Sequence, residues 1–77
     1  MNKEVKSVHV TVDSGGGKTV VIDETTVYRA VNSLEAIHDR VKVIHVSMTY
    51  KQGEKKKANF DSKSKAISWL NLNDTKE

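Results

Sequence analysis

Apolar and polar residues alternate along two stretches of the chain, which is the pattern of a β-strand with one buried face. In residues 5–12, the valines at 8, 10 and 12 share one face. Residues 41–50 repeat the pattern, with large apolar side chains on one face and small, mostly polar ones on the other. A shorter strand-like run follows each stretch, at 18–23 and at 57–60, after a turn sequence containing glycine. The pattern therefore predicts two hairpins.

Each predicted hairpin leads into a segment whose apolar residues recur at helical spacing. The first helix is expected over residues 24–39, with Asp23 or Thr25 as its N-cap. Its apolar stripe is Val27, Ala30, Val31, Leu34, Ile37 and Val41. The second helix follows Asp61 or Ser62 and offers Ala66, Ile67, Trp69 and Leu70 to the core. Residues 1–72 are thus expected to form one domain, and residues 73–77 a polar, frayed tail.

The element order is strand, strand, helix, twice over, which predicts an α+β fold of ββαββα type. We expect a four-stranded antiparallel sheet in the order 2-1-3-4, with both helices on one face and the other face open. The two halves also resemble each other in sequence. "VHVTV" at 8–12 parallels "IHVSM" at 44–48, and "IDETT" at 22–26 parallels "FDSKS" at 60–64, so the offset grows from 36 to 38 residues.

Composition places the chain among small globular proteins with a thin core. At 77 residues it buries only about 60% of the surface of its unfolded form. It has no cysteine, so neither disulfides nor thiolate-bound zinc can add stability, and self-association is one remaining source. No apolar stretch is long enough for a signal peptide or a membrane span. We therefore expect a cytoplasmic protein without membrane contact.

The run "VDSGGGKT" at 12–19 ends like a nucleotide-binding loop, but its spacing and its context do not fit one. Such a loop needs a glycine five positions before Gly17, and that position is Val12. It also needs a helix directly after the loop, whose N-terminus faces the phosphates. The residues after Thr19 are β-branched instead. The glycine run is therefore predicted to be a hairpin turn.

No group of residues in the sequence has the spacing of a catalytic or metal site. His9 and His45 occupy matching positions on the two central strands, but only Asp13 is expected near enough to act as a further ligand. Asp23 and Asp61 are explained as helix caps, and no serine has a neighbouring base in sequence. We therefore expect no enzyme, no metal, no cofactor and no small-molecule substrate.

The first functional hypothesis is a non-enzymatic interaction module that self-associates or docks on a protein partner. Its interface would be the open face of the sheet, which could close against a second copy and bury area that the monomer lacks. The residues expected on this face are His9, Thr11, Val43, His45, Ser47 and Thr49.

The alternative hypothesis is sequence-nonspecific binding of nucleic acid. The net charge is +3, and residues 41–77 carry eight basic and four acidic side chains, against five and six in residues 1–40. Phosphates would be held by the lysine-rich hairpin at 51–57 and by the start of the second helix. The lysines concerned are Lys51, Lys55, Lys56, Lys57, Lys63 and Lys65. A solvated strand edge explains the same lysines without any ligand.

Overall fold

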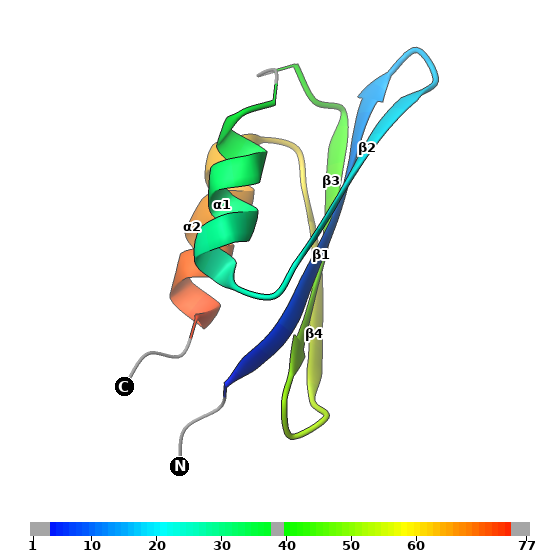
Figure 1. Ribbon diagram of the computed structural model, residues 1–77. Helices are drawn as coiled ribbons and strands as arrows, with labels where there is room; N and C mark the ends of the chain where they lie inside the picture. The colour runs from blue at the N-terminus through cyan, green and yellow to red at the C-terminus, as the bar shows by residue number, and fades with distance from the viewer. Residues whose placement is uncertain (1–3, 38–39, 75–77) are drawn as a thin grey trace.

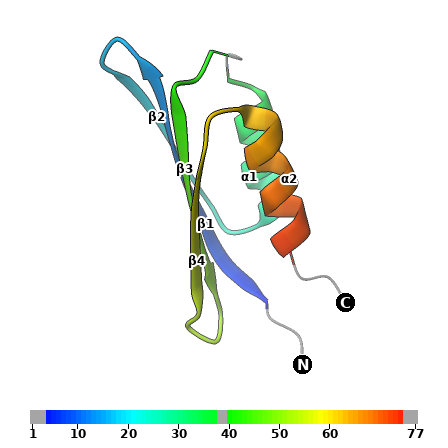
Figure 2. The same ribbon diagram turned by 180° about the vertical axis from the view of Figure 1, so that it is seen from behind.

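The computed structural model describes residues 4–37 and 40–74 and confirms the predicted α+β architecture. The four strands form one antiparallel sheet in the order β2-β1-β3-β4, and both helices cover the same face (Figure 1). The view from behind shows that the opposite face of the sheet carries neither helix (Figure 2). The elements are β1 (Val5–Gly15), β2 (Lys18–Glu24), α1 (Val27–Glu35), β3 (Val43–Tyr50), β4 (Lys55–Phe60) and α2 (Lys63–Asn73).

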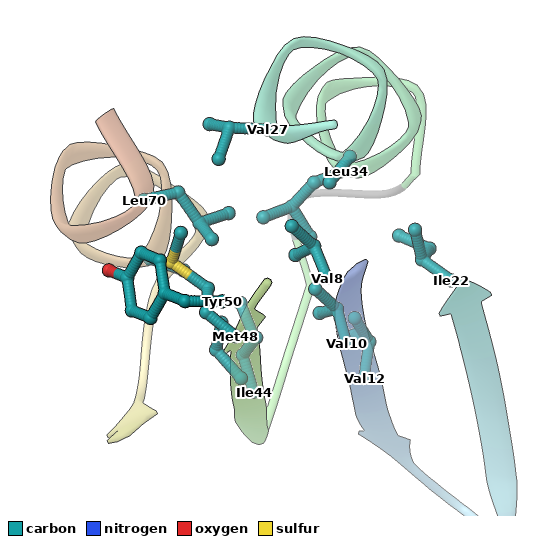
Figure 3. Packing of buried hydrophobic residues seen from close by; sticks show 13 residues of the cluster. Val8, Val10, Val12, Ile22, Val27, Leu34, Ile44, Met48, Tyr50 and Leu70 are labelled. Carbon is teal, nitrogen blue, oxygen red and sulfur yellow. The ribbon is translucent and has the colours of Figure 1, made fainter. Parts of the chain in front are cut away.

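The core lies between the helices and the sheet face that the alternation pattern predicts. The two central strands supply most of it, because every second residue of β1 and β3 points toward the helices. Figure 3 shows these side chains meeting Val27, Leu34 and Leu70 from the helices. The buried strand residues are Val8, Val10, Val12, Ile22, Ile44, Val46, Met48 and Tyr50.

The first helix is shorter than the sequence pattern suggests. It begins at Val27 rather than at residue 24, because Glu24 still pairs with Val8 as part of β2. Its N-cap is Thr26, whose side chain accepts a hydrogen bond from the Arg29 backbone, so the predicted caps Asp23 and Thr25 are wrong. The helix ends at Glu35, and residues 38–39 of the predicted span lie outside the described residues.

The second helix begins as predicted and runs slightly further than expected. Ser62 caps it by accepting a hydrogen bond from the Lys65 backbone. Asn73, which the sequence pattern assigns to the polar tail, is the last residue of α2. Its backbone carbonyl accepts a hydrogen bond of 2.9 Å from the buried Tyr50 hydroxyl, and its side-chain oxygen accepts one of 3.0 Å from Lys56.

The glycine run is a hairpin turn, as predicted. Gly16 and Gly17 connect β1 to β2 and have φ angles of +63° and +81°, which favour residues without a Cβ atom. The residues after them form a strand, so no helix N-terminus faces the loop. Asp13 accepts a hydrogen bond from the Gly15 backbone at 2.9 Å, at the point where the strand register shifts.

A constant shift of 36 residues relates the two halves of the fold. His9 pairs with Asp23 on the neighbouring strand, and His45 pairs with Asn59, each residue lying 36 positions later in the chain. The N-caps Thr26 and Ser62 are related by the same shift. The offset between the two halves therefore stays at 36 and does not grow to 38. The sequence similarity between residues 22–26 and 60–64 is two positions out of structural register.

Candidate interaction surfaces of the sheet

The six residues predicted for the open face all lie on it. In the ladder between the central strands, His9 is opposite Ser47 and Thr11 is opposite His45. Antiparallel partners share a face, and the buried neighbours of these residues point toward the helices, so these four side chains point away from them. Val43 and Thr49 continue the same face at the two ends of β3.

The two histidines have separate partners and do not form one site. The His9 Nδ1 atom lies 3.8 Å from the Asp23 carboxylate, and the His45 Nδ1 atom makes a 2.7 Å hydrogen bond with the Asn59 side-chain oxygen. Asp13, the expected third ligand, instead caps the turn beside it. Across residues 4–37 and 40–74, no three histidine or carboxylate side chains lie close enough to hold a metal ion.

Charge is distributed unevenly across the open face. Asp23 on β2 lies at one side of the face, and Lys55 and Lys57 on β4 lie at the other. The most exposed large apolar residue on this face is Val21, whose relative exposure is 60%. Apart from Val21 and the half-buried Val43, the face is polar, so it lacks the apolar centre typical of a stable face-to-face interface.

The six predicted phosphate-binding lysines lie on different parts of the structure, and four of them have partners within the protein. Lys51 makes a 2.9 Å ion pair with Glu4, which lowers the pKa of the Glu4 carboxyl below its ordinary value of 4.5. Lys65 lies 3.2 Å from the Asp61 carboxylate, one helical turn away. Lys56 donates to Asn73 on the helix side of the sheet.

Lys63 has a structural role at the end of the first helix. Its ammonium group donates hydrogen bonds to the backbone carbonyls of Glu35 at 3.1 Å and Ile37 at 2.6 Å. These carbonyls lie at the C-terminal end of α1, where a positive charge is favourable. Of the six lysines, only Lys55 and Lys57 are exposed and lack a side-chain partner in the described part of the chain, and both lie on the same face of the sheet.

Sequence reasoning missed the outer edge of β2 as a candidate surface. β2 is a terminal strand of the sheet, so the backbone groups on its outer side pair with no strand of the described residues. Val20 and Val21 are exposed on its opposite faces, by 38% and 60%. The signal was present in "KTVVIDE", where apolar residues occupy consecutive positions of a strand that the predicted order places at an edge.

The other edge of the sheet is protected against pairing. The 36-residue shift places Lys56 and Lys57 of β4 at the positions equivalent to Val20 and Val21 of β2. Lysines on an edge strand discourage another strand from adding to it. The two edges are therefore equivalent in geometry and opposite in chemistry.

The comparisons with known proteins add no functional information. No protein-family model matches the chain, and no match to it was found among curated proteins or solved structures. Neither helix in residues 4–37 and 40–74 is long and apolar enough to cross a membrane. The surfaces of the sheet are therefore the features from which a function can be inferred.

Proposed function

We propose that this chain is a non-enzymatic interaction module that self-associates through the exposed edge of its sheet, strand β2. The observation that carries the proposal is the contrast between the two edges. Val20 and Val21 are exposed on β2, whereas the equivalent residues of β4 are Lys56 and Lys57. An edge strand with exposed apolar residues at its centre favours strand addition, and lysines at the same positions oppose it.

Pairing at β2 would also bury apolar surface that this small domain leaves exposed. The β1–β2 hairpin projects away from the two helices, so neither helix covers its outer part (Figures 1 and 2). Val20 points to the helix side of the sheet but remains 38% exposed there. A second strand beside β2 would shield both valines and satisfy the free backbone groups of the edge.

The open face is a less favourable interface than this edge. It presents His9, Thr11, His45 and other polar side chains, whose burial costs free energy unless each finds a hydrogen-bonding partner. Edge pairing leaves most of this face exposed to solvent. The two modes therefore predict different effects for substitutions on the two surfaces.

The nucleic-acid alternative remains a prediction with less support. Four of its six lysines bond to other groups of the protein, and Lys55 and Lys57 alone are a small phosphate-binding surface. Binding through them would weaken steeply as the salt concentration rises.

Sedimentation velocity over a range of protein concentrations tests the proposal. We expect the wild-type protein to form dimers, Val20→Lys to be monomeric and His45→Glu to dimerise like the wild type. Val20 lies on the helix side of the edge, so its substitution leaves the open face intact. Loss of dimers in His45→Glu alone would instead place the interface on the open face.

The same measurement with a mixed-sequence DNA or RNA oligonucleotide tests the alternative. A wild-type protein that stays monomeric at high concentration and binds the oligonucleotide only at low salt would overturn the proposed self-association. A dimer that is indifferent to both salt and oligonucleotide would support it.

A further inference from the structure

The sequence of β2 is complementary to itself when the strand is reversed. The strand reads Lys-Thr-Val-Val-Ile-Asp-Glu, with a basic residue at its start, acidic residues at its end and three apolar residues in its middle. An antiparallel copy places the start of one strand beside the end of the other. Both ends of such a pair would then bring opposite charges together.

We infer that two copies of this chain pair their β2 strands antiparallel about a two-fold axis at Val21, so that Lys18 of each copy faces Glu24 of the other. The inference rests on the proposed self-association and specifies its partner, its register and its charge dependence. It joins the two sheets into one sheet of eight strands, with all four helices on the same side.

Sheet geometry restricts the possible registers to a few. Residues opposite each other in an antiparallel ladder point to the same face, so a two-fold axis normal to the sheet must pass beside a residue that faces its own copy. The candidates near the middle of the strand are Val20, Val21 and Ile22. Only the axis at Val21 overlaps all seven residues of β2.

The other two registers are chemically worse. An axis at Val20 leaves Asp23 and Glu24 without opposing β2 residues. An axis at Ile22 sets those two carboxylates directly against valines and leaves Lys18 unpaired. Like or unmatched charges across a strand pair are unfavourable, whereas opposite charges stabilise it.

The Val21 register gives each face of the new pair a matched set of residues. On the helix side, Val20 faces Ile22 in the middle, and a Lys18–Glu24 pair lies at each end. On the open face, the two copies of Val21 meet at the axis. Within residues 4–37 and 40–74, neither Lys18 nor Glu24 has an ion-pair partner, so both charges are available.

A charge exchange between two chains tests the register. In Lys18→Glu or Glu24→Lys alone, like charges face each other at both ends of the pair, and we expect the dimer to weaken by about tenfold or more. In an equimolar mixture of the two variants, the new carboxylate of one chain faces the new ammonium of the other at one end of the pair, and the original Glu24 and Lys18 face each other at the other end. Native mass spectrometry should therefore show heterodimers in excess over either homodimer.

Lys55→Glu is the matched control, because it makes the same charge change on an exposed residue of the opposite edge. It should leave the dimer unchanged. Circular dichroism of each variant checks that the domain is folded. If the wild type dimerises but neither Lys18→Glu nor Glu24→Lys weakens it, the register is wrong and the proposed self-association stands. A monomeric wild type overturns both.

A cross-linking measurement tests the axis without changing charge. The chain has no cysteine, so Val21→Cys introduces one thiol per chain. Residues facing each other in an antiparallel pair have Cα atoms roughly 4.5–5.5 Å apart, which a disulfide spans. Mild oxidation should give covalent dimers of Val21→Cys, and His45→Cys on the open face should give few. The reverse result contradicts an axis at Val21.

Discussion

Val10 of β1 lies directly opposite Val46 of β3, and the two residues are 36 positions apart in the chain. The same shift relates Leu34 of α1 to Leu70 of α2, and all four side chains are buried. The valine pair therefore marks a pseudo-two-fold axis through the sheet, which exchanges the two β-β-α halves. Equivalent positions in the halves provide matched pairs for experiment.

The two core leucines should contribute similarly to stability. Leu34→Ala and Leu70→Ala each remove a fully buried side chain from the layer between helix and sheet, and each should lower the free energy of unfolding by about 2–5 kcal/mol. Leu72→Ala, at a residue that is 84% exposed, should change it by less than about 0.5 kcal/mol. Urea denaturation measures all three. A Leu70→Ala protein as stable as Leu72→Ala would contradict the described packing of α2.

Lys63 should act as a structural residue and not as a phosphate ligand. Lys63→Met keeps most of the side-chain length but removes the two hydrogen bonds to the carbonyls of Glu35 and Ile37. We expect a loss of about 1 kcal/mol in the free energy of unfolding. Lys65→Met removes only an exposed ion pair with Asp61 and should cost about 0.5 kcal/mol or less. Equal effects of the two substitutions would argue against the capping role of Lys63.

The Glu4–Lys51 ion pair should make stability depend on pH in acid. Because Lys51 lowers the pKa of Glu4 in the folded protein, the unfolded chain binds this proton more readily. The contribution is therefore present above the ordinary pKa of the carboxyl and is lost as the pH falls through its lowered folded value. Glu4→Gln should be less stable than the wild type at pH 7. The difference in urea midpoint should disappear in strong acid, and a difference that persists there would assign it to another cause.

The hydrophobic pattern was sufficient to predict the fold because burial in this domain follows a simple alternation. Every second residue is buried from Val8 to Val12 of β1 and along the whole of β3, so the sequence already separates the two faces of the sheet. The predicted start of α1 was wrong because Asp23 and Glu24 satisfy the sequence preferences of a helix start, whereas pairing with β1 keeps both residues in a strand.

The surfaces were harder to predict than the fold. The open-face residues follow from the same alternation, and all six lie where they were expected. The lysines cluster in sequence, but some of them bond to residues distant in the chain, such as Lys51 to Glu4 and Lys56 to Asn73. They therefore do not form one patch in the structure. The exposed edge at Val20 and Val21 follows from the consecutive apolar residues of β2 only when they are combined with the strand order, so the local pattern alone does not reveal it.

The β1–β2 turn should tolerate substitutions according to backbone conformation alone. Gly16 and Gly17 have positive φ angles and open space where a Cβ atom would lie, so backbone strain and not collision opposes a side chain. Asparagine enters the left-handed region readily and β-branched residues do not. Gly17→Val should therefore lower the free energy of unfolding by about 1–2 kcal/mol, and Gly16→Asn should leave it nearly unchanged. Thermal and urea unfolding of the two variants measure this, and equal destabilisation by both would contradict a turn controlled by φ.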